Sequence, residues 1–250
     1  MNHKKSPDYY ENYSVLSPNG IVLFRTNEEK ITWYVRNNLA RILESDKQTV
    51  QLTFKPKGNG SVGDPYLLDE KLNQCVCCGT REKLTSHHII PRRYIRHFSK
   101  EIRDLAGAYD NMLLCTHDHF AYEHEARELH KQLEEEASLP TLFEDIKPIK
   151  TAGTIERYGH LISSDKKERL LQTLRIYCRK EEISAEDIGK IAALNICTIV
   201  HERSKKVIDA AENLSLFIIR WRKHFVETMH PRFLPRYYDV NRSLEELIIH

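Results

Sequence analysis

The 250-residue sequence predicts an α+β fold, and three observations along the chain support this class. Residues 1–70 combine a hairpin signal, a helical pattern and an alternating strand pattern. Residues 71–138 hold four of the six cysteines and seven of the thirteen histidines, and they end in a charged helix. Residues 139–250 show mainly helical spacing of apolar residues. We therefore expect a small N-terminal α/β unit, a cysteine- and histidine-rich core and a helical C-terminal domain, with boundaries near residues 70 and 138.

The N-terminal unit opens with a turn signal. Pro18-Asn19-Gly20 separates two short apolar runs and predicts a β-hairpin. Thr26 is the expected cap of a following helix, because threonine accepts hydrogen bonds from free N–H groups at a helix start. A helix and then a strand are predicted from helical spacing of Ile31, Tyr34, Val35, Leu39, Ile42 and Leu43 and from alternation of Val50, Leu52 and Phe54.

The C-terminal region predicts stacked helices after a connector. Ser138, Pro140 and Pro148 mark the expected connector. Ser184 and Asp187 have the spacing of a capping box at the start of a later helix. The aromatic and apolar residues that recur at helical spacing near the end of the chain are expected to be core, and they are Phe217, Trp221, Phe225 and Met229.

Composition limits the function classes. No apolar stretch approaches the roughly 18 residues of a membrane helix, and the first ten residues lack the apolar segment of a secretory signal. We therefore expect an intracellular protein in a reducing compartment. The 38 basic and 36 acidic residues nearly cancel, so bulk charge does not identify a polyanionic partner.

The cysteine spacing predicts a structural Zn²⁺ site. Cys75 and Cys78 form a Cys-x-x-Cys pair before Gly79, the arrangement in which two thiolates converge on one ion from a tight turn. Cys115 and Asp118 are separated by the same two-residue gap, with the aspartate in place of a fourth cysteine. The predicted ligands are Cys75, Cys78, Cys115 and Asp118. His117 is the alternative to Asp118, and Cys77 is a spare thiol or an alternative to one of its neighbouring cysteines.

Paired histidines lie between the two halves of this site. The chain reads Leu-Thr-Ser-His87-His88-Ile-Ile-Pro-Arg-Arg, then Asp110-Asn111-Met-Leu-Leu-Cys, with His119 at the start of a predicted helix. With the cysteine knuckle, this combination resembles the HNH nuclease family. The resemblance implies a ββα-metal core, in which two strands and a helix surround one catalytic divalent ion and a separate Zn²⁺ braces them.

The same resemblance implies roles for individual residues. His88 would be the general base, and His87 and His119 would bind Mg²⁺ or Mn²⁺. Asn111 would orient His88, although Asp110 occupies the position where the family more often has asparagine, so both stay candidates. By helical spacing, Glu123 follows His119 by four residues on the same face, where its carboxylate would add an oxygen ligand or hold a metal-bound water.

One geometric condition applies to the paired histidines. Adjacent residues on a regular strand point to opposite faces. His87 and His88 can therefore share a site only if the strand bends or the metal lies at its edge.

Four segments also resemble the C-terminal region of 3′–5′ exonuclease-domain-containing proteins. They are residues 16–58, residues 91–98, residues 110–115 and residues 220–235. The chain contains no Asp-x-Glu segment, so the resemblance does not imply exonuclease activity. The paired histidines, which such relatives often lack, favour catalysis, whereas the kinship also fits a binding role.

A basic and aromatic segment follows the paired histidines directly. We expect its cations to contact a phosphate backbone and its aromatic residues Tyr94 and Phe98 to stack on unpaired bases. The candidate nucleic-acid contacts are Arg92, Arg93, Arg96 and Lys100.

The sequence thus predicts a Zn²⁺-braced, Mg²⁺- or Mn²⁺-dependent HNH endonuclease with DNA as the favoured substrate. The alternative is a non-catalytic zinc module that binds nucleic acid or protein. In either case the helical C-terminal region is the candidate docking surface for a protein partner or for a second copy of the chain.

Overall fold

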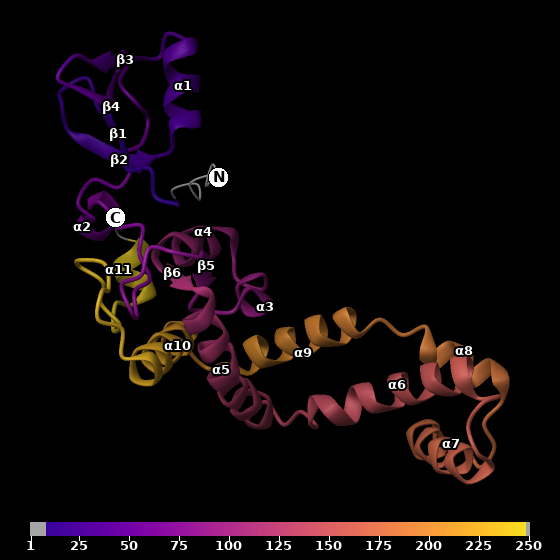
Figure 1. Cartoon of the computed structure of the whole chain (residues 1–250). Coiled ribbons are helices and arrows are strands. Elements are labelled where there is room, and N and C mark those ends of the chain that lie inside the picture. Colours follow the sequence, from indigo (N-terminus) through magenta and orange to yellow (C-terminus); the bar gives the residue numbers. More distant parts are fainter. Residues whose placement is uncertain (1–8, 249–250) are drawn as a thin grey trace. The chain divides into compact units, whose positions relative to one another are not determined.

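The computed structural model describes residues 9–248, apart from the side chains of residues 143, 247 and 248, and has the expected α+β class (Figure 1). Most of the first ten residues, which are predicted to lack a secretory signal, lie outside the described residues. Contacts divide the chain into two compact units, one formed by residues up to Arg127 together with those from Asn213, the other by Glu128–Glu212. The three domains expected from the sequence remain a prediction. Among the described helices, none combines the length and apolar character of a membrane span.

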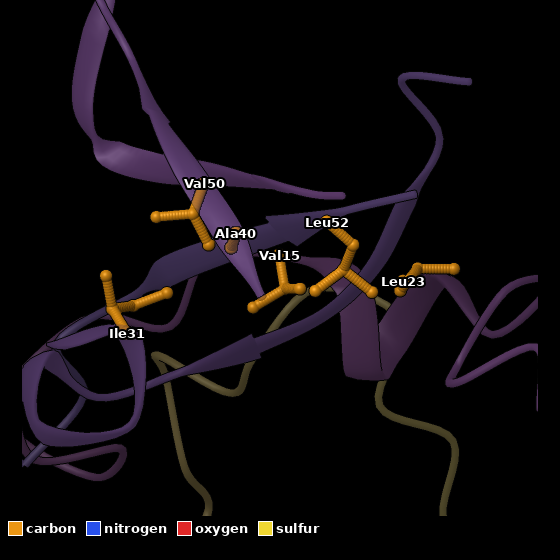
Figure 2. Close-up of a cluster of buried hydrophobic side chains, with 6 residues drawn as sticks. All are labelled: Val15, Leu23, Ile31, Ala40, Val50 and Leu52. Carbon is orange, nitrogen blue, oxygen red and sulfur yellow. The ribbon is translucent and has the colours of Figure 1, made fainter. Parts of the chain in front are cut away.

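The first unit begins with a four-stranded sheet in the order β2-β1-β4-β3, in which β1 and β4 are parallel. The predicted hairpin is confirmed: the Gly20 N–H donates to Ser17 O at 3.0 Å, and Gly20 has the positive φ of 82° that glycine tolerates. Figure 2 shows the buried apolar cluster between this sheet and its helix. The elements are β1 (Tyr13–Leu16), β2 (Val22–Thr26), α1 (Glu28–Arg36), β3 (Ala40–Leu43) and β4 (Asp46–Leu52).

The helix expected to extend to Leu43 ends at Arg36 instead. Asn38 takes a left-handed φ of 58°, and Ile42 then pairs with Val50 across β3 and β4. The pairing of these strands overrides the helical spacing of their apolar residues. The start also differs by one residue, because the side chain of Asn27, not that of Thr26, accepts the capping hydrogen bond.

The candidate site lies on a second, two-stranded antiparallel sheet and the helix that follows it. The chain forms strand β5, a segment with two short helices, strand β6 and helix α5 in that order, and β6 runs directly into α5. In the register of this sheet, His87 faces Met112 and His88 faces Asn111. The elements are α2 (Pro65–Leu68), β5 (Leu84–His88), α3 (Arg92–Ile95), α4 (Lys100–Tyr109), β6 (Asn111–Cys115) and α5 (Thr116–Glu136).

Two helices from the end of the chain complete the first unit, α10 (Leu214–Met229) and α11 (Leu244–Ile248). Phe217, Trp221 and Phe225 on α10 are buried, which confirms their predicted place in the core. Tyr94 and Phe98 are also buried, and the Tyr94 ring packs edge-on against Phe217. The expectation that these two aromatic residues stack on nucleic-acid bases is therefore wrong.

The second unit consists of helices packed around an apolar core. The capping box of Ser184 and Asp187 is confirmed at the start of α8. Pro148, expected in a connector, instead lies inside α6. This helix begins before the proline, at a second capping box formed by Thr141 and Glu144. The helices wholly within this unit are α6 (Leu142–Tyr158), α7 (Ser164–Cys178), α8 (Ala185–Ala192) and α9 (Ile196–Ala210).

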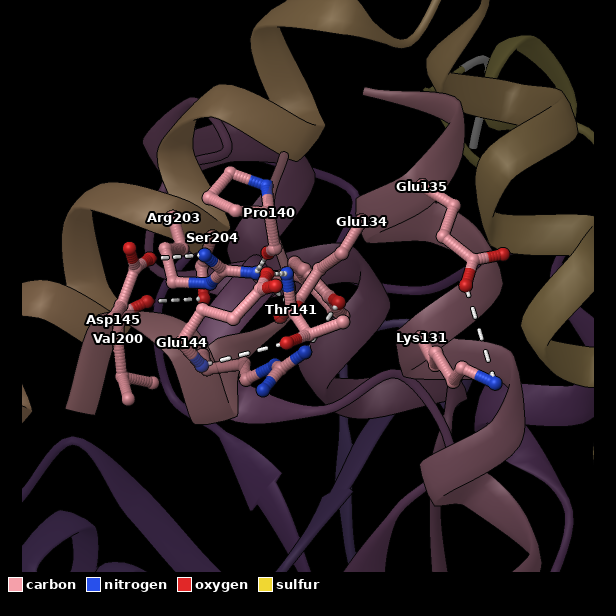
Figure 3. Close-up of polar contacts among 12 residues, drawn as sticks. Lys131, Glu134, Glu135, Pro140, Thr141, Glu144, Asp145, Val200, Arg203 and Ser204 are labelled. Atoms are coloured by element: carbon pink, nitrogen blue, oxygen red, sulfur yellow. Dashed lines mark hydrogen bonds and ion pairs between the residues drawn. The ribbon is translucent and has the colours of Figure 1, made fainter. Parts of the chain in front are cut away.

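One buried cation links three segments of this second unit. The Arg203 guanidinium forms ion pairs with Glu134, at 2.6 Å, and with Asp145 (Figure 3). It also donates to the carbonyl of Pro140 at 2.6 Å. Because a buried charge is costly unless it is paired and hydrogen-bonded, these contacts hold the end of α5 and the start of α6 to α9.

Candidate metal centres

The first candidate metal centre gathers the four predicted zinc ligands. One ligand atom from each of Cys75, Cys78, Cys115 and Asp118 lies within 4.8 Å of the others. Cys75 and Cys78 sit in a tight turn, in which the N–H of Gly79 donates to Cys75 O at 2.9 Å. Gly79 has a φ of 81°, a conformation that residues with a Cβ rarely adopt. The other two ligands come from the junction of β6 and α5.

The spacing of this group fits Zn²⁺. Two thiolates bound tetrahedrally at about 2.3 Å from one zinc ion lie about 3.8 Å apart, and the Sγ atoms of Cys78 and Cys115 are 3.8 Å apart. The N–H of Asp118 donates to the Cys115 sulfur at 3.4 Å, as a hydrogen bond to a metal-bound thiolate would. The donor set of three sulfurs and one carboxylate is among those that zinc accepts.

Asp118, and not His117, completes this group. Burial opposes ionisation of Asp118, but hydrogen bonds from Cys75 and then His117 outweigh it and lower the pKa of Asp118 to about 2. Asp118 is therefore a carboxylate at neutral pH. The His117 side chain is 89% exposed. Its Nδ1 lies 3.1 Å from Asp118 Oδ1, whereas the Cys75 sulfur contacts Asp118 Oδ2.

The second candidate centre contains His87, His119 and Glu123. Glu123 Oε1 lies 3.8 Å from His87 Nδ1 and 3.7 Å from His119 Nε2. His87 is on β5, and the other two residues are one turn apart on α5, so that the strand and the helix face each other through these side chains. Two nitrogens and a carboxylate oxygen at this separation fit a divalent cation bound between them.

The protonation of His87 also fits a metal ligand. Burial, followed by the neighbouring His119 and His88 rings, lowers the pKa of His87 to about 3. The ring is therefore neutral at pH 7, which is the form that binds metals. Its Nε2 is buried and has no hydrogen-bond partner among the described residues.

Aromatic rings hold His87 in place. Tyr122 meets the imidazole edge-on, with ring centroids 5.1 Å apart, and Phe225 from α10 stacks on it at 6.2 Å. Phe225 and Tyr122 also contact each other edge-on at 5.0 Å. This packing leaves His87 little freedom to rotate away from Glu123.

His88 lies outside the second centre, as expected from strand alternation. His87 and His88 occupy the end of β5 and belong to opposite faces of the sheet. Burial and the charge of Arg92 lower the pKa of His88, so it is unprotonated at neutral pH. Its Nδ1 is buried without a hydrogen-bond partner among the described residues.

Of the two candidates for orienting His88, Asn111 has the better position. Asn111 lies directly opposite His88 in the strand register, and the Ser86 hydroxyl donates to Asn111 Oδ1 at 2.6 Å. Both oxygens of Asp110 instead bind Arg222. Asp110 therefore has a structural partner elsewhere.

The four predicted basic contacts have different surroundings. Arg92 and Arg96 are exposed and lie four residues apart, with Arg92 in the short helix α3. The Arg93 guanidinium packs over the Tyr94 ring, 4.8 Å from its centroid. Lys100 forms an ion pair with Asp104 at 2.8 Å. Arg92 and Arg96 are consequently the better placed of the four for contact with phosphate.

Two residues that support the second centre, Thr85 and Tyr122, are not among the residues predicted from the sequence. Thr85 hydrogen-bonds the ring of His119, and Tyr122 packs on His87. A signal for Thr85 was present, because it lies two positions before His87 and therefore on the same strand face. Tyr122 is three residues after His119, within one helical turn of a predicted ligand.

Comparisons with known proteins place the chain beside nuclease-related proteins. No protein-family profile matches the chain, and no solved structure matches it significantly. The chain is 27% identical over 263 residues to the exonuclease 3′-5′ domain-containing protein 2 of Homo sapiens, covering 98% of this chain and 42% of that protein. It is 28% identical over 264 residues to the protein of the same name in Drosophila melanogaster, covering 97% of this chain and 45% of that protein.

A plant protein shows a similar level of likeness. The chain is 28% identical over 231 residues to protein RRP6-like 3 of Arabidopsis thaliana, covering 80% of this chain and 25% of that protein. These relatives include nuclease-related proteins. The chain spans less than half the length of each of them, so their names describe proteins with additional segments.

Proposed function

We propose that the protein is a metal-dependent endonuclease of the HNH type that hydrolyses phosphodiester bonds in nucleic acid, with DNA as the favoured substrate. The observation that carries this proposal is the second centre, His87, His119 and Glu123, one residue from the unprotonated His88. The resemblance to exonuclease-domain proteins supports nucleic acid as the substrate class.

In the proposed mechanism, His88 is the general base. A neutral imidazole accepts a proton from water near pH 7 and so generates the nucleophile. Asn111, its neighbour across the sheet, orients the ring. A divalent cation held by His87, His119 and Glu123 would neutralise charge on the phosphate and on the leaving oxygen.

The opposite orientation of His87 and His88 suits this chemistry. In an in-line displacement the attacking and leaving oxygens lie on opposite sides of the phosphorus. A phosphate at the end of β5 would have His88 on one side and the three candidate ligands on the other. The strand alternation therefore separates the base from the cation side.

The zinc group would act as a brace for the catalytic residues. Cys115 ends β6, and Asp118 lies in the first turn of α5, immediately before His119. An ion that joins these two ligands to the Cys75–Cys78 turn would fix the first turn of α5. His119 would then keep its distance from Glu123 and His87.

Arg92 and Arg96 would position the nucleic-acid backbone. Both are exposed, and Arg92 is close enough to His88 to lower its pKa through its charge. Cations at this place attract phosphate without reading sequence.

The test is a cleavage panel with the full chain loaded with Zn²⁺. Supercoiled plasmid, single-stranded DNA and RNA are incubated with Mg²⁺, Mn²⁺ or EDTA, using wild-type protein, Glu123→Gln and the control Glu125→Gln. Glu125 is exposed, lies on the same helix and belongs to neither centre. We expect cleavage that requires the added ion, is weakened in Glu123→Gln and recovers at higher ion concentration.

A different result would overturn the proposal. Nucleic-acid binding by the wild-type protein without cleavage under any of these conditions would assign the chain to the non-catalytic binding modules. Equal cleavage by Glu123→Gln and the wild type at low ion concentration would exclude the second centre as the metal site.

A further inference from the structure

We propose that Thr85 is a positioning residue that fixes the tautomer of His119, so that Nε2 is the nitrogen offered to the cation. The inference deepens the proposed function, because it rests on His119 being a metal ligand. It concerns a residue outside the predicted ligand set and the predicted catalytic set.

Two hydrogen bonds of the Thr85 hydroxyl carry the argument. Thr85 Oγ1 lies 2.8 Å from His119 Nδ1 and 3.1 Å from the carbonyl oxygen of Leu114. Leu114 is directly opposite Thr85 in the register of β5 and β6, so its carbonyl position is set by the sheet. Thr85 thus connects the strand pair to the first turns of α5.

The direction of both hydrogen bonds follows from counting protons. A threonine hydroxyl has one proton to donate, and a carbonyl oxygen can only accept. The hydroxyl proton therefore goes to Leu114 O, which leaves Thr85 Oγ1 as an acceptor for His119. A metal-binding histidine ring is neutral and has a single N–H, so this N–H must then lie on Nδ1 of His119.

This tautomer prepares His119 for a cation. With the proton on Nδ1, the lone pair of Nε2 is free, and Nε2 is the nitrogen that lies 3.7 Å from Glu123 Oε1. In the other tautomer an N–H would point toward the cation and would exclude it. A hydrogen bond to the second nitrogen is the usual way in which a protein fixes the ligand nitrogen of a histidine.

The position of Thr85 agrees with this role. It is partly buried and lies two residues before His87, on the same face of β5. One strand face thus supplies both a candidate ligand, His87, and the residue that orients a second one. Ser86 lies between them on the opposite face, where it donates to Asn111.

The experiment first reads the tautomer directly in the Zn²⁺-loaded full chain without added Mg²⁺ or Mn²⁺. Long-range ¹H–¹⁵N correlation spectra of histidine-labelled protein distinguish Nδ1–H from Nε2–H, and the His119→Gln variant assigns the His119 signals. We expect Nδ1–H in the wild type, a shift toward Nε2–H in Thr85→Val, and Nδ1–H again in Thr85→Ser. Ser86→Ala, on the opposite face of the same strand, should leave the His119 tautomer unchanged.

Metal affinity gives the second readout. Titration with Mn²⁺ should show binding weakened by about 10–100-fold in Thr85→Val, the usual effect of removing such a partner, and restored in Thr85→Ser. A wild-type protein with Nε2–H, an unchanged affinity in Thr85→Val, or failure of Thr85→Ser to restore affinity would each contradict the inference.

The two readouts separate this inference from the proposed function. If the wild type binds no Mn²⁺, the proposed catalytic centre fails, whereas the tautomer measured without that ion still tests the role of Thr85. If the wild type binds Mn²⁺ and the tautomer is Nε2–H, the centre stands and the inference about Thr85 fails.

Discussion

Arg222 on α10 binds both carboxylate oxygens of Asp110, with Nε 2.7 Å from Oδ1 and Nη2 2.8 Å from Oδ2. Both residues are fully buried. The Tyr238 hydroxyl adds a contact to Oδ1 at 3.3 Å, and the Arg222 guanidinium packs over the Tyr109 ring. Because Asp110 immediately precedes β6, this ion pair joins a helix near the end of the chain to the strand that carries Asn111.

Removing the charge of Asp110 should destabilise the fold strongly. In Asp110→Asn the buried Arg222 loses its counterion, and breaking a buried pair in this way costs about 3–5 kcal/mol. Urea unfolding measures the change. The control is Asp104→Asn, which removes an exposed pair with Lys100 and should change the free energy of unfolding by less than about 1 kcal/mol. Equal effects of the two substitutions would contradict the structural role given to Asp110.

The zinc group predicts a specific metal content. Cys115→Ser should lose most of the bound zinc, because serine is a poor replacement for a thiolate ligand. Cys77 is buried beside the group but is not part of it, so Cys77→Ala should keep about one zinc per chain. Elemental analysis after dialysis measures both. Zinc retained in Cys115→Ser, or lost in Cys77→Ala, would show that the ligand set is wrong.

Substitution by alanine should have opposite effects at two glycines, Gly79 after the Cys75–Cys78 turn and Gly107 in α4. Gly79 has a φ of 81°, and a Cβ there would lie 2.7 Å from the Phe233 ring. Gly79→Ala should therefore destabilise the protein, by about 1–2 kcal/mol from the backbone conformation alone. Gly107 is helical and has open space around a Cβ, so Gly107→Ala should stabilise by about 0.5–1 kcal/mol. Thermal unfolding of both variants tests the sign at each position.

The exposed arginines predict a salt-dependent effect on nucleic-acid binding. Arg92→Ala should weaken binding and reduce the slope of log affinity against log salt concentration by about one. Lys100→Ala should have a smaller effect, because Lys100 already pairs with Asp104. Fluorescence anisotropy at several salt concentrations measures both slopes. A larger effect of Lys100→Ala would place the backbone along α4 and away from α3.

The sequence predicted which side chains would lie close together in the two candidate centres, because metal sites combine few residue types at short spacing. Cys75 and Cys78 are recognisable as a pair, and the one-turn spacing of His119 and Glu123 depends only on their common helix. The opposite faces of His87 and His88 likewise follow from strand geometry.

Long-range contacts could not be predicted in this way. Asp110 and Arg222 are 112 positions apart, and no local pattern links them. The spacing of apolar residues predicted a helix at Ile42, but this residue lies in a strand because it pairs with Val50. The hydrogen bond between Thr85 and His119 depends on how α5 lies on the sheet, which only the folded chain defines.

The most direct test of the central claim is the single-turnover cleavage rate of His88→Ala compared with His124→Ala. His124 is an exposed histidine of the same helix as His119 and belongs to neither metal centre. Loss of a general base should lower the rate by about 10²–10⁴-fold in His88→Ala, with zinc content, Mn²⁺ affinity and nucleic-acid binding unchanged, while His124→Ala cleaves at the wild-type rate. Cleavage by His88→Ala at the wild-type rate would contradict the assignment of His88 as the base.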